Sequence, residues 1–362
     1  MNNNYCVIMA GGIGSRFWPL SKTRKPKQFL DVLGTGKTLI QQTWNRFAQI
    51  IPEQNILIVT NDIYSDIIKE QIPQITDDQI LCEPMRRNTA PCIAYANHKI
   101  MNKCKDANIV VAPSDHLIMN EQDFLSVINK GLDFVANNDA LLTLGIKPSR
   151  PETGYGYIQI EPQDETILNS TLTPVKLFTE KPNIEMAKDF YEDGNFYWNA
   201  GIFLWSLKTI NAAFDKYLPD VNSLFYDGAD AYNTEKENEF ISNIYPQCQN
   251  ISIDYGIMEN ADNKFVLLSE FGWSDLGTWG SLYEKIEKDK TENAIKGNNV
   301  FIHDSENNIV NVPDEKLVVL QGLKDMIVVE SDDILLVCKK EDEQKIKHYV
   351  KDVSIKLGND YI

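Results

Sequence analysis

The stretch YCVIMAGGIGSRFWPLSKTRKPKQF, residues 5–29, carries the strongest signal in the sequence. It begins with a short, β-branched apolar run that is typical of a buried strand. Three glycines (GGIG) follow directly, and glycines at this point let backbone N–H groups approach an anion closely. From Arg16 to Lys27 the segment then has five basic residues and no acidic residue. A glycine turn that leads from a strand into a basic block favours the binding of a polyphosphate.

The same segment has a plainer interpretation as a tight connection between a strand and a helix. Two common phosphate-binding motifs are excluded. The dinucleotide-binding fingerprint requires a third glycine at the position of Phe17. Gly36-Lys37-Thr38 matches the end of a P-loop, but Asp31 stands where the first glycine of that motif belongs, and no strand precedes it.

Outward from this stretch, short apolar runs alternate with longer amphipathic segments through the first half of the chain. We expect strands at residues 5–10, 56–60, 79–82, 109–112 and 140–145. We expect helices at residues 38–50, 62–72, 88–103 and 121–137. This alternation predicts a mostly parallel sheet covered on both faces, with ligands bound beyond the carboxyl ends of its strands.

The second half has a mixed pattern and then changes character. Strands are expected at 157–160, 175–178 and 201–205, and helices at 184–191 and 235–244. The polar stretch KDKTENAIKGNN, residues 288–299, indicates a linker. Beyond it, strands at 300–303, 309–312, 317–321, 326–329 and 334–338 and a helix at 341–353 predict a small coiled or rolled all-β unit. We therefore predict an α/β, Rossmann-like domain over residues 1–287 and a small, β-helix-like C-terminal domain over residues 288–362.

Composition narrows the class of protein. The chain has 362 residues, a formal net charge of −17 and 43% hydrophobic residues, which is typical of a soluble globular protein. Such an acidic chain has no broad basic face for nucleic acid. The apolar runs are too short to cross a membrane, and the first residues do not form a signal peptide. The six cysteines include no C-x-x-C pair, which argues against structural zinc and for a reducing compartment. We expect a cytoplasmic protein without nucleic-acid or membrane partners.

A series of motifs closely resembles the nucleoside-diphosphate-sugar pyrophosphorylases, and specifically the mannose-1-phosphate guanylyltransferases. GGIGSRFWPLS and KPKQF carry the resemblance, which continues in order through EPMRRNTAP (83–91), APSDH (112–116), TGYGYI (153–158), FTEKP (178–182), WNAGIF (198–203), SIDYGIME (252–259) and GWSDLGTW (272–279). Many relatives continue into a cupin-type phosphomannose isomerase domain. The chain is similar to the short, monofunctional form.

The resemblance implies a nucleotidyltransferase that transfers GMP from GTP to α-D-mannose 1-phosphate, giving GDP-mannose and pyrophosphate. The sugar phosphate would attack the α-phosphorus in line. Because a sugar phosphate is a dianion near neutral pH, no general base is required. Mg²⁺ is the expected cofactor, with Mn²⁺ as the alternative. Two rival interpretations remain, which are the same chemistry on another nucleotide and sugar 1-phosphate, and a non-catalytic regulatory subunit on this fold.

The resemblance assigns the catalytic roles to five residues. Arg16 would bind the β- and γ-phosphates, Lys27 the α-phosphate and leaving group, and Lys181 the incoming sugar phosphate. Asp115 and Asp275 would hold the metal, and two carboxylates are enough because Mg²⁺ keeps its other positions for water and phosphate. For Asp115 alone, a helix N-cap is the plainer interpretation.

The nucleotide is assigned to the glycine turn and to the loop after the third strand. Glu83 is a suitable acceptor for the N1 and N2 hydrogens of guanine. Asn88 or Thr89 would cap the following helix, whose N-terminus would also offer free amides to the base or ribose. The full nucleotide-binding set is Ala10, Gly11, Gly12, Gly14, Ser15, Glu83, Arg87, Asn88, Thr89, Ala90 and Ser114.

The sugar-binding set is Gly154, Tyr155, Glu180, Asn199 and Gly201. The Glu180 carboxylate can bind vicinal hydroxyls, and Asn199 can both donate to and accept from a hydroxyl. A solvent-exposed pair of Glu180 and Lys181 is the alternative. The aromatic side chains between residues 196 and 205 are expected to pack in the core.

The C-terminal strands present apolar residues that require a partner. These are Val318, Leu320, Ile327, Val329, Leu335 and Val337. The partner is either the catalytic domain of the same chain or an identical unit in a second chain, and the resemblance favours a homodimer. Because the quoted motifs end at Trp279, truncation near Lys290 is expected to leave the chemistry assembled.

Overall fold

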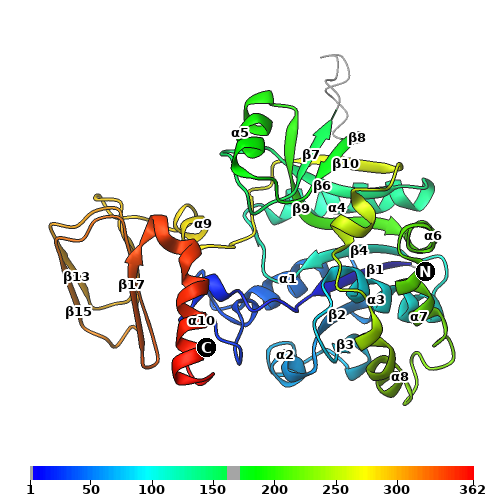
Figure 1. Ribbon diagram of the computed structural model, residues 1–362, viewed down its shortest axis with the longest axis horizontal. Helices are drawn as coiled ribbons and strands as arrows, with labels where there is room; N and C mark the ends of the chain where they lie inside the picture. Colours follow the sequence, from blue (N-terminus) through cyan, green and yellow to red (C-terminus); the bar gives the residue numbers. More distant parts are fainter. Residues whose placement is uncertain (1–2, 161–171) are drawn as a thin grey trace. The chain divides into compact units, whose positions relative to one another are not determined.

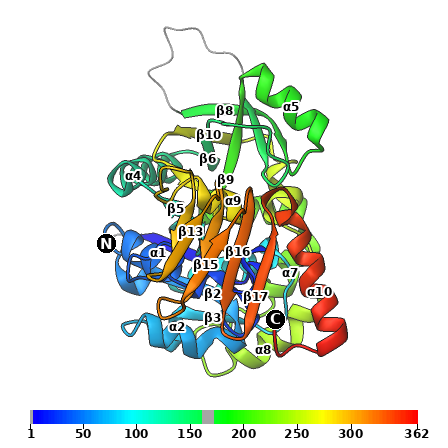
Figure 2. The same ribbon diagram turned by 90° about the vertical axis from the view of Figure 1, so that its left-hand side faces the viewer.

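The computed structural model describes residues 3–160 and 172–362 (Figures 1 and 2). Contacts divide the chain into two compact units. The described residues within 1–11, 43–114 and 118–273 form unit 1, and residues 12–42, 115–117 and 274–362 form unit 2. The segment that contains the glycine turn therefore starts in unit 1 and continues in unit 2. The boundary at residue 287 that the sequence predicts stays a prediction.

Unit 1 is built on a nine-stranded sheet with the strand order β3-β2-β1-β4-β9-β6-β10-β8-β7. The pairs β1–β2, β1–β4, β2–β3 and β6–β10 are parallel, and β8 and β9 run against their neighbours. The strands are β1 (Asn4–Met9), β2 (Ile56–Asn61), β3 (Ile80–Glu83), β4 (Asn108–Pro113), β6 (Leu141–Ile146), β7 (Tyr157–Ile160), β8 (Leu172–Thr179), β9 (Phe196–Ser206) and β10 (Lys264–Ser269). The predicted mixed, mostly parallel sheet is confirmed.

Helices cover both faces of this sheet, since consecutive residues of β1, β2 and β4 are buried. In Figure 1, α3 lies along β1–β3, and α4 lies against β4, β6 and β9. The helices are α1 (Leu39–Phe47), α2 (Ser65–Gln71), α3 (Thr89–Lys103), α4 (Glu121–Asn137), α5 (Ile184–Asp193), α6 (Leu207–Tyr217), α7 (Pro219–Tyr226) and α8 (Glu237–Ile244).

Sequence reasoning missed α6, α7 and β10. The signal for α6 was present. Ser206 caps the helix by accepting from the N–H of Thr209 at 3.1 Å, and buried apolar side chains follow at helical spacing. Pro219 then separates α6 from α7, because proline fits the first turn of a new helix but not the interior of an old one.

The C-terminal part of unit 2 is a small parallel β-helix, and Figure 2 shows its strands β13 beside β15 and β16 beside β17. One ladder joins β12, β14 and β16, with Ala294 opposite Ile309 and Ile309 opposite Ile327. A second ladder joins β13 and β15, and β17 closes the coil antiparallel to β16. The elements are β12 (Ala294–Lys296), β13 (Val300–His303), β14 (Ile309–Asn311), β15 (Val318–Gln321), β16 (Met326–Ser331), β17 (Ile334–Lys339) and α10 (Ile346–Leu357). Three shorter elements lie outside the β-helix, namely β5 (Leu117–Ile118), β11 (Trp273–Ser274) and α9 (Trp279–Tyr283). The β-helix-like unit is confirmed.

The predicted linker at residues 288–299 is wrong, because this stretch forms the first coil of the β-helix. Asn293 and Asn308 are buried and stack on successive coils, where the Asn293 side-chain oxygen accepts from the Asn308 amide at 2.9 Å. The Asn308 side chain also donates to Leu323 O at 3.0 Å and accepts from Met326 N at 2.9 Å. Polar composition indicated a linker, but these polar groups bond inside the coil.

The core of unit 2 joins the β-helix to the segment that follows the glycine turn. Phe17 and Trp18 are buried in one cluster with Ile327, Val329 and Trp279. The ring centroids of Phe17 and Trp279 are 4.9 Å apart, and Trp18 Nε1 donates to Tyr361 O at 2.8 Å. Ile327 and Val329 therefore need no second chain, which corrects that part of the prediction. The expectation that truncation near residue 290 leaves the chemistry assembled stays a prediction, although truncation would remove Ile327 and Val329 from the cluster that buries Phe17.

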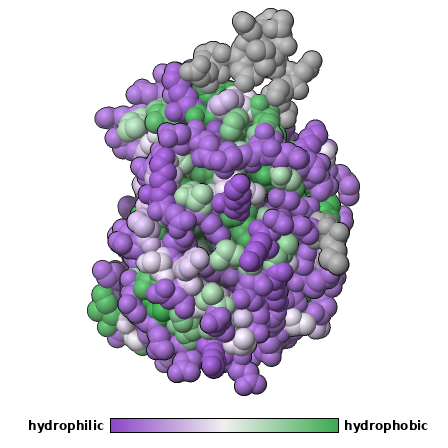
Figure 3. Space-filling model, turned by 90° about the vertical axis from the view of Figure 1, so that its right-hand side faces the viewer, coloured by the Kyte–Doolittle hydropathy of each residue, from purple (hydrophilic) through white to green (hydrophobic). Residues whose placement is uncertain are grey.

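Surface properties agree with the composition. The face drawn in Figure 3 is mostly hydrophilic, with only scattered apolar side chains. Among the described residues, no helix combines the length and the apolar character that crossing a membrane requires. All six cysteines lie in the described part of the chain and are free thiols.

Asn308→Ala is expected to lower the free energy of unfolding by about 3 kcal/mol, because it removes three side-chain hydrogen bonds and leaves buried partners unpaired. Asn298→Ala is the matched control, since Asn298 is exposed on a neighbouring turn. Urea denaturation followed by circular dichroism measures both. Equal stability of the two variants would show that the asparagine stack does not hold the coil.

Candidate active site

The glycine turn is shaped by the basic segment that follows it. Gly14 has φ of 71°, and a Cβ at this position would lie 2.6 Å from the Cβ of Lys27. The Gly12 carbonyl accepts from Gln28 Nε2 at 3.0 Å, and the Ile13 carbonyl accepts from Lys27 N at 3.2 Å. Only glycine satisfies both the backbone angle and the close approach at residue 14. The GGIG and KPKQF motifs are therefore two sides of one structure in unit 2.

Lys27 is the centre of the charged groups in unit 2. Its side chain is 3% exposed, and its ammonium contacts Asp115 Oδ2 at 2.7 Å. The ammonium also donates to the carbonyls of Asp275 and Leu276, both at 2.9 Å. These contacts use all three donors of a lysine ammonium. The structure thus brings Lys27, the Asp115 carboxylate and the Asp275 backbone together and shows that Lys27 bonds to the protein itself, while their predicted roles toward phosphate and metal stay predictions.

Asp115 is held as a carboxylate. Burial alone would raise its pKa, but the Lys27 ammonium and His116 lower the pKa below its ordinary value. Its side chain is still 29% exposed, so that a ligand can reach it. Asp275 is oriented by its own loop, because its Oδ1 accepts from Gly277 N at 2.8 Å.

The donor set fits Mg²⁺. Within residues 3–160 and 172–362, no group of three or more His, Cys, Asp and Glu side chains converges as a metal site. A set of two carboxylates excludes a closed structural site and suits a cation that takes most of its ligands from water and phosphate.

Arg16 lies on the 3-10 turn Ser15–Phe17, directly after Gly14. Its Nε donates to Gln344 Oε1 at 2.8 Å in the turn before α10. This contact fixes one edge of the guanidinium, which stays partly exposed. In the same basic block, Lys22 forms an ion pair of 2.6 Å with Asp332. The β-helix and α10 therefore position the basic residues of the segment.

In unit 1, the predicted nucleotide residues Ala10, Gly11, Glu83 and Ser114 lie at the carboxyl ends of β1, β3 and β4. Glu83 is 6% exposed and accepts a hydrogen bond from the Tyr245 hydroxyl. Burial raises the pKa of Glu83 to about 7, against the opposing effects of Tyr245 and Arg86. A Cβ on Gly11 would lie 3.5 Å from Glu83 Oε2, which places the two residues side by side.

The N-terminus of α3 does not offer the free amides that the sequence suggested. Asn88 caps the helix by accepting from Thr89 N at 3.0 Å, and Ala90 N donates to Ile251 O at 3.1 Å. Pro91 has no N–H to offer. Thr89 Oγ1 accepts from Ile253 N at 2.9 Å, and Arg87 donates to Pro246 O at 2.6 Å. This loop is therefore bonded to the segment at residues 246–253, and the capping interpretation of Asn88 is correct.

Asn199, in the predicted sugar set, has a fixed orientation. Its Oδ1 accepts from Thr143 Oγ1 at 2.8 Å and from Gly201 N at 3.1 Å. Its Nδ2 donates to Asp254 Oδ1 at 2.9 Å. The expected dual role is therefore corrected, because the oxygen already accepts two hydrogen bonds and the nitrogen faces the carboxyl group.

Glu180 and Lys181 do not form the solvent-exposed pair of the plainer interpretation. The Glu180 side chain is 7% exposed, whereas that of Lys181 is 57% exposed. A Cβ on Gly156 would lie 2.4 Å from Glu180 Oε2 and 3.5 Å from Asn199 Nδ2, so both atoms border the same point. A larger residue at position 156 would therefore displace the Glu180 carboxyl group.

The remaining members of the sugar set surround this point. Tyr155 packs edge-on against Trp198 and Trp273, with ring centroids 5.1 Å and 5.2 Å apart. Gly154 N donates to Glu152 Oε1 at 3.0 Å. The aromatic side chains at 196, 198, 203 and 205 are buried, as predicted, whereas Tyr197 is only partly buried against the core.

Sequence reasoning missed two residues of these clusters, Tyr245 and Asp254. Asp254 stands in the quoted SIDYGIME motif, at the start of the π-helical turn Asp254–Met258, without a predicted role. Burial, followed by the negative charge of Glu180, raises the pKa of Asp254 to about 7. Tyr245 lies between recognised motifs, and only its contact with Glu83 reveals it.

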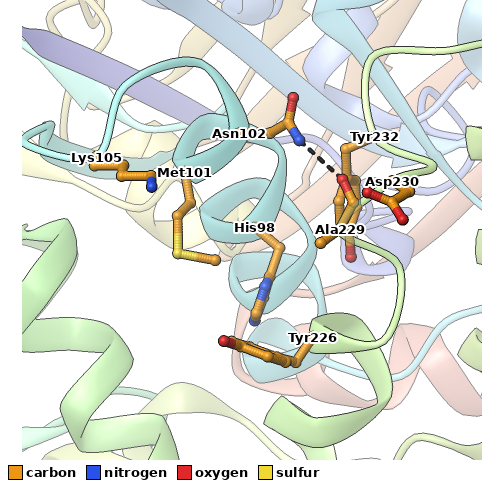
Figure 4. A pocket seen from close by; sticks show the side chains of 8 residues that line it. All are labelled: His98, Met101, Asn102, Lys105, Tyr226, Ala229, Asp230 and Tyr232. Carbon is orange, nitrogen blue, oxygen red and sulfur yellow. Dashed lines mark hydrogen bonds between the residues drawn. The ribbon is translucent and has the colours of Figure 1, made fainter.

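A separate cavity of about 370 Å³ lies on unit 1, beside the C-terminal half of α3 (Figure 4). His98 points into the space between Met101 and Tyr226, and its Nε2 is hydrogen-bonded to Asn222 Oδ1 at 2.8 Å. Burial lowers the pKa of His98, which favours the neutral ring. The lining is His98, Met101, Asn102, Lys105, Tyr226, Ala229, Asp230 and Tyr232. None of these residues belongs to the predicted site.

Gly14→Ala is expected to lower both the melting temperature and the activity more than Gly34→Ala. Both glycines have φ near +70°, but a Cβ on Gly34 meets no atom within 4 Å. The backbone costs about 1–2 kcal/mol in each variant, and the clash with Lys27 adds about 1–3 kcal/mol at residue 14 only. Calorimetry and pyrophosphate release measure the two effects. Indistinguishable variants would contradict the close fit of Gly14 on Lys27.

Comparisons with known proteins identify the family of the chain. The nucleotidyl transferase family model matches residues 5–292, and the MannoseP isomerase/GMP-like beta-helix domain model matches residues 297–353. The mannose-1-phosphate guanylyltransferase of Klebsiella pneumoniae is 34% identical over 352 residues, which are 95% of this chain and 73% of that protein. The alginate biosynthesis protein AlgA of Pseudomonas aeruginosa is 35% identical over 360 residues, with 96% and 71% covered.

A solved structure from Thermus thermophilus, named a mannose-1-phosphate geranyltransferase, matches with a TM-score of 0.86 and 28% identity. The match covers 98% of this chain and 100% of that chain. Together with the lysine-centred carboxylates and the glycine turn, these matches show that the chain belongs to the nucleotidyl transferase family, in the group of the mannose-1-phosphate guanylyltransferases.

Proposed function

We propose that the chain transfers GMP from GTP to α-D-mannose 1-phosphate and releases GDP-mannose and pyrophosphate. One observation carries the proposal most directly. The Lys27 ammonium pairs with Asp115 and bonds to the Asp275 carbonyl, and the Lys27 backbone N–H bonds to the glycine turn, so that one residue holds a cation and a carboxylate beside a turn of the kind that binds phosphate. The names of the relatives supply the substrates.

In this reaction the protein positions the reactants and neutralises charge. Arg16 binds the β- and γ-phosphates of GTP. Lys27 has a double role, in which it keeps Asp115 ionised and exchanges one carbonyl partner for an oxygen of the α-phosphate as charge develops on the leaving group. Asp115 and Asp275 hold Mg²⁺, with Mn²⁺ as the alternative. The metal supplies positive charge next to the phosphates.

The nucleoside is bound by the residues at the carboxyl ends of β1, β3 and β4. Gly11, Gly12, Gly14 and Ser15 offer backbone N–H groups to the phosphates, because they carry small side chains or none. Glu83 accepts from the guanine edge. The loop that borders the base takes its shape from Arg87, Asn88, Thr89 and Ala90. The nucleotide site is completed by Ala10 and Ser114.

The sugar phosphate is bound by residues of β7, β8 and β9 and their loops. Lys181 binds the phosphate through its ammonium. This ammonium pairs with Glu180, and the Lys181 side chain is 57% exposed, so a ligand can reach it. Glu180 accepts from sugar hydroxyls and Asn199 donates to one. The proposed sugar site is completed by Gly154, Tyr155 and Gly201. The attacking oxygen is already ionised, so no residue acts as a general base.

We further propose a catalytic domain over residues 1–287, a β-rich domain over 288–362, a cytoplasmic location and a homodimer. Phe301 and Val319 support the homodimer, because they are neighbours in register on β13 and β15 and are 55% and 61% exposed. Leu335 and Val337 are also exposed, at 61% and 50%. Exposed apolar side chains on adjacent strands are typical of a protein interface.

Pyrophosphate release with single pairs of substrates tests the proposed function. We expect release with GTP and mannose 1-phosphate, and at least about tenfold less when ATP, UTP or dTTP replaces GTP or when glucose 1-phosphate replaces mannose 1-phosphate. Preference for another pair would establish the first rival function. No release with any pair from a folded protein would establish the regulatory one.

Asp115→Asn is expected to lower kcat about 10²–10³-fold at saturating Mg²⁺, because the substitution removes a charge that acts on the developing transition state. Lys27→Ala should lower kcat to a similar extent, and more than it weakens GTP binding. Asp314→Asn, an exposed acid of the β-helix, is the control and should be unaffected. A stably folded Asp115→Asn enzyme with normal kcat would contradict the metal assignment.

Phe301→Asp is expected to convert a dimer into a monomer without loss of secondary structure, because it places a charge on the apolar patch of β13 and β15. Leu357→Asp is the control, since Leu357 is 63% exposed on α10. Light scattering at micromolar concentration measures the mass of each. A monomeric intact chain would remove the proposed homodimer.

A further inference from the structure

Asp254 bonds to Asn199 of the predicted sugar-binding set, although Asp254 was not itself a member of that set. Its Oδ1 accepts from Asn199 Nδ2 at 2.9 Å, and the Asn199 oxygen is already bound to Thr143 Oγ1 and Gly201 N. The amide therefore cannot flip without losing three hydrogen bonds. Asp254 thus fixes which atom of Asn199 faces a ligand.

Asp254 also shares its surroundings with a second carboxyl group. Glu180 raises the pKa of Asp254 through its charge, and the same Glu180 borders Asn199 Nδ2 at the position of Gly156. The groups that act on the pair are Lys181, which bonds to Glu180, and Tyr255, whose hydroxyl donates to Glu180 O at 3.4 Å. Glu259 accepts from the Glu180 N–H at 3.0 Å and so holds the backbone of that residue.

The backbone at Asp254 is unusual for a residue with only a structural role. The residue opens a π-helical turn, a conformation that is rare and is found mostly at functional sites. Its side chain is surrounded by protein but remains partly exposed. A carboxyl group placed in this way costs stability when it ionises, because burial and Glu180 both oppose its charge.

We propose that Asp254 is a positioning residue for sugar recognition, which holds the Asn199 amide toward the substrate as a donor beside Glu180, so that this donor and the two carboxyl groups bind the hydroxyls of a neutral sugar. The inference rests on the proposed function. It adds that the site recognises an uncharged diol through one donor and two carboxyl groups, and that a sugar bearing its own carboxylate is repelled.

Asp254→Asn tests the proposal, because the substitution keeps the shape of the side chain and removes its charge and proton. The expected result is an increase of about 10- to 100-fold in the KM for mannose 1-phosphate, with the KM for GTP within about twofold of wild type. Asp262→Asn is the matched control, since the Asp262 side chain is 93% exposed in the same unit.

Two further measurements separate recognition from a structural role. The folded-state pKa of Asp254 lies above its ordinary value. The contribution of Asp254 to the free energy of unfolding therefore falls as pH rises from about 4 to about 7. Asp254→Asn lacks this loss, and its melting temperature at pH 8 should equal or exceed that of wild type. In wild type, the KM for mannose 1-phosphate should also rise above pH 7, as Asp254 loses its proton beside the incoming dianion. This rise should be absent in Asp254→Asn, whereas the ionisation of the substrate is the same for both enzymes.

Each outcome decides the proposal. An unchanged KM for mannose 1-phosphate, or a lower melting temperature with both KM values raised together, would overturn it and leave Asp254 as a structural residue. Wild-type enzyme that forms no GDP-mannose would instead overturn the proposed function, so the two failures are distinguishable.

Discussion

A buried ammonium needs oxygen partners on every side, and this requirement organises unit 2. Lys27 is almost fully buried, and an unpaired charge at that depth would be prohibitively costly. Asp115 and the carbonyls of residues 275 and 276 satisfy it. One residue thereby holds an aspartate after β4 and the loop after β11 through its ammonium, and the glycine turn through its backbone N–H. Because removal of the Lys27 side chain would release the first two, a loss of activity in Lys27 variants includes the loss of this arrangement.

The β-helix and α10 also hold the segment that follows the glycine turn. Phe17 and Trp18 pack into its core, Arg16 bonds to Gln344 and Lys22 pairs with Asp332. The residues after the glycine turn therefore depend on a domain that follows them by about 300 positions in sequence. The C-terminal part of unit 2 therefore positions the basic residues that follow the glycine turn.

In unit 1, two carboxyl groups are held against their ionised form. Burial raises the pKa values of Glu83 and Asp254 to about 7. In both cases the folded state binds the proton more tightly than the unfolded chain, so each group reduces stability as pH rises towards 7. Glu83 lies beside Gly11, and Asp254 lies beside Asn199 and Glu180. Such a loss of stability is expected where a polar group serves a ligand rather than the fold.

The sequence by itself determined the sheet, the β-helix and the motifs, because hydrophobic periodicity and glycine positions are local properties. It placed α4 at residues 121–137 and β7 at 157–160, as the structure has them. It also named the residues that converge on Lys27. Contacts between distant segments could not be derived from periodicity. Only the tertiary structure decided that residues 288–299 are a coil of the β-helix, that Phe17 packs with Ile327 and Val329 of that unit, that α3 has its first amides occupied, and that the Asn199 amide donates to Asp254. Each of these depends on contacts that form only after folding. For the polar groups, burial is the physical reason, because a buried donor or acceptor must find a partner wherever the fold supplies one.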